Sequence, residues 1–251
     1  MSTETNNTSN ARPMPRDWAS ITNPLRLLLI GAGGNGAEFH EGLSRLHHGL
    51  KAIGGAGLDV TVIDDDEVSE SNVVRQRFWP HDVGANKAIT LVHRTNNMMG
   101  TSWKAAPIRY TGEKLAGKFD LVVTAVDNKA ARNALQVENK GLMWLDMGCD
   151  RDKGQVVLGR IGDNTLTSEW PSTLAHFPDM ADPNEVNVPS CSAADSLARQ
   201  DLMVNTMVAT HAINMLWKAF RANQFIHNGV MIDLAQGFSQ AIPFMPTQHK
   251  Q

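Results

Sequence analysis

The sequence has few of the features that mark secreted, membrane or nucleic-acid-binding proteins. Only two cysteines, Cys149 and Cys191, occur in 251 residues, so nothing indicates a disulfide-stabilised fold or an oxidising compartment. No apolar run approaches the roughly 18 to 20 residues that span a bilayer, and the polar segment 1–23 lacks the apolar core of a secretory signal. Lys and Arg number 23 against 26 Asp and Glu, which gives no basic footprint for a nucleic-acid backbone. We therefore expect a cytoplasmic protein with neither a membrane nor a nucleic-acid partner.

The composition is that of one large folded domain. Hydrophobic residues make up 42% of the chain and charged residues 20%, which is enough apolar surface for a sizeable core. We expect residues 1–23 to form a flexible tail, because they are polar and rich in Thr, Asn and Ser. Residues 24–251 are then the domain.

The first half of the domain alternates apolar runs with helical patterns. Strands separated by helices predict βαβ units, and therefore a Rossmann-like α/β fold with a doubly wound, mostly parallel sheet. The expected strands are 25–30, 59–63, 104–108, 119–126 and 142–145, and the expected helices are 37–48, 83–99 and 129–139.

The second half predicts an added strand region at the C-terminus. A strand at 155–158 is followed by a long segment, about 162–190, with four prolines and no periodicity. Such a long irregular segment is more often functional than incidental in a compact domain. A helix at about 195–222 and two strands, 229–234 and 240–243, complete the chain.

A glycine-rich loop follows the first expected strand. Gly31, Gly33 and Gly36 fit the G-x-G-x-x-G pattern, in which glycine lets backbone N–H groups and a helix N-terminus approach phosphate oxygens. Asp64, at the end of the second strand, is placed to accept hydrogen bonds from a ribose. These residues alone suit a nicotinamide dinucleotide as well as any other nucleotide.

Polar and charged residues after the second and third strands point to a triphosphate. Asn72, Arg75 and Lys87 offer an amide, a planar guanidinium and an ammonium to phosphate oxygens. Asp127 follows the strand at 119–126, and a carboxylate beside phosphates is typical of a Mg²⁺ site. Singly, Arg75 and Lys87 also read as solvated surface charges, and Asp127 as a helix N-cap.

Together these motifs resemble the adenylation domain of the ThiF/MoeB/HesA family, which ubiquitin-activating enzymes share. The resemblance rests on four motifs: Gly31-x-Gly33-Gly34-x-Gly36, Asp64-x-Asp66-x-Val68-x-x-Ser71-Asn72-x-x-Arg75-Gln76, Gly84-x-x-Lys87-Ala88 and Asp127-Asn128-x-x-x-Arg132. They cover about residues 25–133, and the remainder matches more loosely. Within the family, the chain is most similar to the ThiF-like proteins of the PRTRC gene system.

The resemblance implies an ATP-dependent adenylyltransferase. Such an enzyme activates the C-terminal carboxylate of a ubiquitin-like or sulfur-carrier protein, and a homodimer is implied. Segment 162–190 corresponds to the family's crossover loop. The implied catalytic residues are Arg75, Lys87, Asp127 and Cys191, with Asp127 binding Mg²⁺. The implied nucleotide-binding residues are Gly31, Gly33, Gly34, Gly36, Asp64, Asp66, Asn72, Arg75, Gln76 and Lys87.

Cys191 has two interpretations. It lies in Pro-Ser-Cys-Ser-Ala-Ala ahead of an expected helix, where a thiolate is stabilised and becomes a better nucleophile. In several family members a cysteine in this loop receives the carrier's C-terminus, so the resemblance implies the same for Cys191. A small buried cysteine with a packing role is the other interpretation, and we favour that role for Cys149.

Two features depart from the family pattern. Two cysteines cannot form the four-thiolate zinc site of many relatives, and no histidine shows ligand spacing to a cysteine, so we expect no zinc. Relatives also supply an arginine from an N-terminal segment to the neighbouring subunit's site. Arg12 and Arg16 lie in the right region but lack the surrounding pattern.

Two other functions remain open from the sequence. An NAD-binding oxidoreductase would account for Gly31 to Gly36 and Asp64, but it leaves Asn72, Arg75 and Lys87 unexplained. A nucleotide-binding adaptor that docks a ubiquitin-fold partner without turnover is compatible with the departures from the family pattern.

Overall fold

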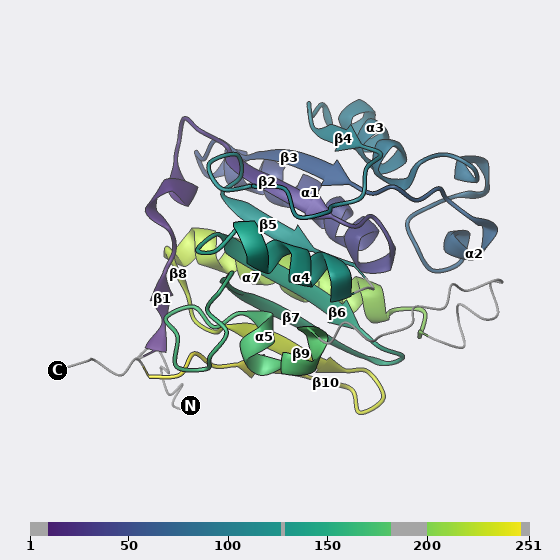
Figure 1. Cartoon of the computed structure of the whole chain (residues 1–251). Coiled ribbons are helices and arrows are strands. Elements are labelled where there is room, and N and C mark those ends of the chain that lie inside the picture. Colours follow the sequence, from purple (N-terminus) through teal and green to yellow (C-terminus); the bar gives the residue numbers. More distant parts are fainter. Residues whose placement is uncertain (1–9, 127–128, 182–199, 247–251) are drawn as a thin grey trace, which may run out of the picture.

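A computed structural model describes residues 10–126, 129–181 and 200–246. Its centre is a mixed eight-stranded sheet with the strand order β10-β9-β7-β6-β5-β2-β3-β4 (Figure 1). Arg12–Pro13 (β1) and Gln224–Phe225 (β8) form a separate antiparallel pair. The strands were expected from apolar runs, and the Rossmann-like, mostly parallel fold is confirmed.

The parallel half of the sheet comes from the alternating first half of the sequence. Its neighbouring strands all pair parallel, which brings their carboxyl ends to one edge. The strands are Leu25–Ile30 (β2), Leu58–Ile63 (β3), Lys104–Ala106 (β4), Leu121–Thr124 (β5) and Met143–Cys149 (β6).

The antiparallel half extends the sheet on the far side of β6. It consists of Lys153–Arg160 (β7), Gly229–Asp233 (β9) and Phe238–Ile242 (β10). Only three residues separate β6 from β7, too few for a crossover helix, so these two strands pair antiparallel. The expected C-terminal strand region is therefore present.

Helices cover both faces of the sheet because strand residues alternate between two cores. On β2, Leu27 and Leu29 join one core, while Leu28 and Ile30 join the other. The first core holds residues of Gly34–Ala52 (α1), Lys87–Met99 (α3) and Val204–Ala222 (α7). The second holds residues of Lys129–Glu138 (α4) and Thr173–His176 (α5). Figure 1 shows α4 in front of the sheet and α7 behind it. Among the described residues, none of the helices has the length and apolarity that crossing a bilayer requires.

Helices α1 and α7 run parallel and pack closely through glycines of α1. A Cβ atom added to Gly42 would lie 2.5 Å from Ile213, and one added to Gly49 would lie 3.3 Å from Trp217. The contacts advance along both helices in the same direction, which fixes their parallel orientation. The N-termini of both helices therefore lie at the same edge of the sheet.

The expected flexible tail, residues 1–23, differs from the structure over residues 10–23. Trp18 is 4% exposed and packs against the rings of Phe220 and Phe225. Arg12 is 7% exposed in β1. Residues 16–19 form a 3-10 helix, and an aromatic anchor in a polar segment explains the order. Residues 1–9 lie outside the described residues.

The last long helix begins later than expected. The sequence predicts it from about residue 195, but residues 200–203 are not helical and α7 begins at Val204. The backbone N–H of Asp201 donates to the Arg151 carbonyl at 2.7 Å, which ties this segment to the β6–β7 turn. Residues 195–199 lie outside the described residues. The expected irregular segment at 162–190 contains α5 and a 3-10 helix, Pro178–Ala181.

A buried histidine makes the fold sensitive to acid. His40 of α1 is 2% exposed, lies edge-on to Trp103, and its Nε2 has no hydrogen-bond partner among the described residues. Burial, with a smaller effect from the charge of Arg94, lowers the pKa of His40 to about 3. The His40 imidazole therefore takes up a proton near pH 6.5 in the unfolded chain but stays neutral in the folded chain until the pH is close to 3. Because the unfolded state binds more protons, the free energy of unfolding falls as the pH drops from 6.5 towards 3.

We predict that His40→Leu removes this part of the acid sensitivity. At pH 5 the buried imidazole lowers the free energy of unfolding by about 2 kcal/mol relative to pH 7.5, and leucine has no proton to bind. Urea unfolding of both proteins at several pH values measures the difference. His93→Leu is the matched control, because the His93 side chain on α3 stays exposed in the folded protein. Parallel pH profiles for His40→Leu and the unaltered chain would contradict the prediction.

Candidate functional site

The predicted nucleotide-binding residues, all of which the structure describes, lie on loops and helix starts that follow β2 and β3, at the edge where β2, β3, β5 and β6 end. Loops leave this edge after Ile30, Ile63, Thr124 and Cys149. Ligands of open α/β sheets bind at such an edge.

The glycine loop after β2 is tight on one side and open on the other. Gly31 has a φ of +95°, and a Cβ there would lie 2.8 Å from the Ala125 carbonyl oxygen. A Cβ on Gly36 would lie 2.0 Å from the Gly31 carbonyl oxygen, so the helix can start this close to the strand only with glycine at both positions. Gly33 differs, since a Cβ there would meet no atom of the described residues within 4 Å. With respect to the described residues, the loop is therefore open at the Gly33 Cβ position, next to the N-terminus of α1.

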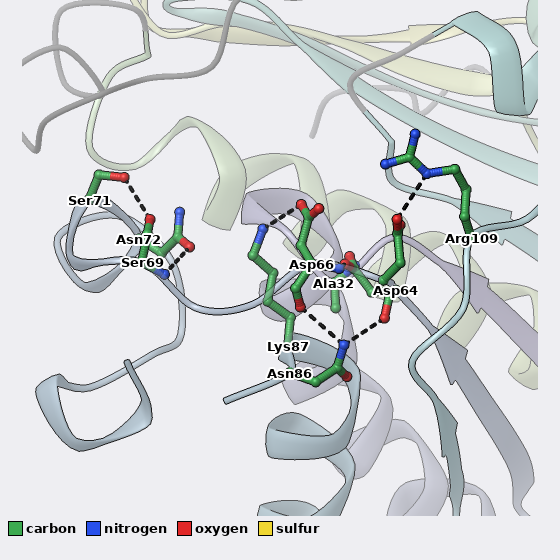
Figure 2. A network of polar contacts seen from close by, with 10 residues as sticks. Ala32, Asp64, Asp66, Ser69, Ser71, Asn72, Asn86, Lys87 and Arg109 are labelled. Carbon is green, nitrogen blue, oxygen red and sulfur yellow. Dashed lines mark hydrogen bonds and ion pairs between the residues drawn. The ribbon is translucent and has the colours of Figure 1, made fainter. Parts of the chain in front are cut away.

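Asp64 at the end of β3 is held against this loop. Its carboxylate accepts hydrogen bonds from the backbone N–H groups of Ala32, at 2.5 Å, and Asp66, at 2.8 Å. Burial raises the pKa of Asp64, and the two N–H donors oppose that shift. Asn86, the N-cap of α3, donates to the carbonyl oxygens of Asp64 and Asp66 and holds the acidic segment in place (Figure 2).

Lys87 and Asp66, both predicted nucleotide-binding residues, form an ion pair. Lys87 Nζ lies 2.9 Å from Asp66 Oδ2, and Figure 2 shows the two side chains pointing toward each other. Lys87 is 8% exposed, while the Asp66 side chain is 58% exposed. The Lys87 ammonium therefore reaches the edge with a counter-charge already beside it.

Asn72 and Gln76 lie on the segment between β3 and α3. Asn72 Oδ1 accepts from the Ser69 N–H and so closes a capping box on Glu70–Val73 (α2). Gln76 Oε1 is buried and has no hydrogen-bond partner among the described residues. The structure gives Asn72 a local structural role that the sequence does not predict.

Arg75 contacts a second cluster of polar side chains at the end of β6. This second cluster consists of Gln200, Cys149, Asn35 and Asn205. Arg75 NH1 donates to Gln200 Oε1, and Gln200 Nε2 donates to Cys149 Sγ at 3.3 Å. The Cys149 sulfur also contacts the side-chain oxygens of Asn35, at 3.6 Å, and Asn205, at 3.4 Å. Desolvation lowers the pKa of Arg75, and burial raises the pKa of Cys149 to about 11. A thiol with this pKa is neutral at pH 7, in agreement with a structural role for Cys149.

A buried ion pair lies beneath the loop between β5 and α4. Arg132 Nε lies 2.8 Å from Asp146 Oδ1, and the two residues are 5% and 0% exposed. Arg132 NH2 also donates to the carbonyl of Val126, the last described residue before Asp127. Arg132, part of the motif read from the sequence, thus contributes to the structure of this edge.

The structure does not describe all of the predicted residues, and it places the N-terminal arginines away from this edge. Asp127 and Cys191 lie outside the described residues, as do positions 182–190 of the expected crossover loop. The Arg12 guanidinium donates to the carbonyls of Glu169, Asn10 and Met245 of its own chain. In Figure 1, β1 lies on the side where β2 and β3 begin, away from α2. Arg16 is exposed in the same region.

The sequence reasoning missed Asn35, Asn86, Gln200 and Asn205. Asn86 directly precedes a helix, and N-cap preference could have identified it. Asn35 is a variable position of the glycine motif, and the motif itself predicts no role for it. No sequence pattern identifies Gln200 or Asn205, because their contacts are with residues far away in the chain.

The fold and edge are those of a Rossmann-like α/β protein with a glycine-rich strand-to-helix loop. The sequence profile of the ThiF family matches residues 16–251, so the chain belongs to the ThiF family. No curated protein matches the sequence. The narrower similarity to PRTRC-system proteins stays a prediction.

Solved structures share the fold at low sequence identity. PaaA is similar with a TM-score of 0.60 and 15% identity, over 88% of this chain and 64% of PaaA. MccB from E. coli, solved with ATP, has a TM-score of 0.61 and 14% identity, over 91% of this chain and 66% of MccB. MccB solved with AMPCPP and MccA gives 0.60 and 13%, over 90% and 65%. The chain thus spans slightly less than two thirds of these proteins.

We predict that alanine at Gly36 lowers the stability of the fold, whereas alanine at Gly33 lowers the affinity for ATP. Gly36→Ala forces a methyl group onto the Gly31 carbonyl and lowers the free energy of unfolding by about 3 kcal/mol or more. Gly33→Ala places its methyl group in open space, so we expect stability within about 0.5 kcal/mol of the unaltered chain and ATP affinity lower by about tenfold. Urea unfolding and calorimetric titration with Mg-ATP measure the two effects. Equal stability losses at both positions would show that the loop is not open at Gly33.

Proposed function

We propose that this protein is an ATP-dependent adenylyltransferase that activates a carboxylate of a peptide or protein. The observation that best supports this is the glycine loop at the N-terminus of α1, where no described residue lies within 4 Å of a Cβ on Gly33. Arg75 and Lys87 both lie on the chain that leaves the same edge of the sheet after β3. A helix N-terminus with flanking cations favours phosphate groups. Asp64, held by the loop, is placed for the ribose hydroxyls.

The residues fit the charge changes of adenylation. The carboxylate oxygen attacks the α-phosphorus of ATP, the bond to the β-phosphate oxygen breaks, and pyrophosphate leaves with the electron pair. Because the nucleophile is already an anion, no general base is needed. Arg75 and Lys87 would orient two repelling anions and stabilise negative charge on the departing pyrophosphate. Asp127 would hold the Mg²⁺ that accompanies the triphosphate.

The substrate that we propose is the C-terminal carboxylate of a ubiquitin-like or sulfur-carrier protein. Family membership supports this class, and the E. coli MccB structures that contain MccA support a peptide or protein as the acyl donor. The family also supports a homodimer. Arg12 is engaged within its own chain, so an arginine supplied by a partner subunit would have to come from elsewhere.

We predict that Arg75→Ala, Lys87→Ala and Asp127→Ala each reduce pyrophosphate exchange into ATP by about a hundredfold or more. Each removes a charge that stabilises the transition state or holds the metal. The assay uses carrier proteins that end in glycine, with Mg²⁺, and is repeated with a chelator. Lys118→Ala is the control, since Lys118 is exposed in the loop that precedes β5, at the opposite edge.

Three results would count against this function. Exchange that survives both Arg75→Ala and Asp127→Ala would overturn the assignment of the site. Tight binding of NAD without binding of ATP would favour an oxidoreductase instead. Binding of ATP and a carrier without exchange would identify an adaptor.

We predict that Cys191→Ala separates activation from transfer. Adenylation does not use the thiol, so exchange should stay within about twofold of the unaltered enzyme. A thiol-linked carrier product, detected by non-reducing electrophoresis and mass spectrometry, should be lost. Cys149→Ala keeps Cys191 and should still form a product linked to that thiol, even where its rate of activation falls. A thiol-linked product that persists in Cys191→Ala would assign the transfer step to another residue.

A further inference from the structure

Gln200 joins the two sides of the second cluster. It lies just before α7, and its side-chain amide uses both ends: the oxygen accepts from Arg75 and the nitrogen donates to Cys149. One side chain therefore connects a residue that follows α2 with the last residue of β6.

The Cys149 end of this connection is rigid. Asn205 is 2% exposed in the first turn of α7, and Asn35 is 7% exposed in the first turn of α1. A Cβ on Gly34 would lie 2.5 Å from Asn205 Oδ1, so the amide is packed against the glycine loop itself. The thiol accepts from Gln200, and its own proton can be donated to an asparagine oxygen. The N-termini of two long parallel helices thus fix the sulfur.

The Arg75 end is held without being neutralised by Gln200. A carboxylate at this position would offset the guanidinium charge, as Asp66 does for Lys87. The neutral amide of Gln200 orients the guanidinium without adding a negative charge of its own beside it. The hydrogen bond from Arg75 to Gln200 therefore bears on where the guanidinium lies.

We propose that Gln200 is a positioning residue that fixes the Arg75 guanidinium at the nucleotide edge by linking it to Cys149 and Asn205. This inference rests on the proposed function, in which Arg75 contacts the phosphates. It assigns to Gln200, Cys149 and Asn205 a role that none of the motifs of the sequence describes.

A double-mutant cycle on Mg-ATP affinity tests the inference in the full-length chain. We expect Gln200→Ala to weaken binding about tenfold and Arg75→Ala to weaken it at least as much. Because Gln200 acts through Arg75, Gln200→Ala should cost no more than about twofold when Arg75 is already alanine. Gln240→Ala, an exposed glutamine of β10, is the matched control, and unfolding curves confirm that every variant folds.

A second measurement reports the linkage without ATP. In a Cys191→Ser background Cys149 is the remaining thiol, and its alkylation by iodoacetamide should accelerate about fivefold or more in Gln200→Ala. Arg75→Ala should also accelerate the alkylation of Cys149, because Gln200 then loses its hydrogen bond from Arg75. Lys87→Ala should leave the rate of alkylation unchanged.

The outcomes separate this inference from the proposed function. If Arg75→Ala weakens ATP binding but Gln200→Ala does not, or if the two losses multiply in the double variant, Gln200 does not position Arg75. Unchanged alkylation in both variants would overturn the linkage. If the unaltered chain does not bind Mg-ATP, the proposed function fails, and the positioning role falls with it even where alkylation confirms the contact.

Discussion

The contact between the Gly31 carbonyl and the Cα of Gly36 sets the geometry of the whole nucleotide edge. With 2.0 Å between that oxygen and a would-be Cβ, α1 can begin only where residue 36 has no side chain. This fixes the N-terminus of α1 directly after β2, with Asn35 facing the end of β6 and Ala32 bound to Asp64. The position of α7 follows in turn, because Gly42 and Gly49 let Ile213 and Trp217 pack closely on α1.

This geometry gives the two cations of the edge different surroundings. Lys87 starts α3 and is paired with an exposed carboxylate, so an arriving triphosphate must compete with Asp66 for the ammonium. Arg75 is partly desolvated and donates a hydrogen bond to the Gln200 amide. In the proposed function both cations contact the phosphates, Lys87 from an ion pair with Asp66 and Arg75 from a hydrogen bond to the Gln200 amide.

The sequence predicts the parts of this site that depend on neighbours along the chain. Apolar runs predict β2, β3 and β5, and the spacing of Gly31, Gly33 and Gly36 predicts the turn between β2 and α1. Long-range contacts are beyond such reasoning: the Arg75–Gln200 hydrogen bond joins residues 125 positions apart. The order of segment 10–23 was missed for the same reason, because Trp18 is ordered by Phe220 and Phe225, which are distant in sequence.

The buried pair of Arg132 and Asp146 shows how the core supports the remaining part of the edge. Asp146 Oδ1 also accepts from the Thr124 hydroxyl, and Trp144 donates to that hydroxyl, so β5, β6 and α4 meet in one buried network. Removing one member of a buried ion pair typically costs about 3 to 5 kcal/mol, since the other charge stays buried and unpaired. Such a cost favours a single arrangement of β5 against α4. Arg132 also donates to the carbonyl of Val126, so the buried network holds the backbone of the residue that precedes Asp127. The proposed chemistry needs a carboxylate at Asp127 to hold the metal.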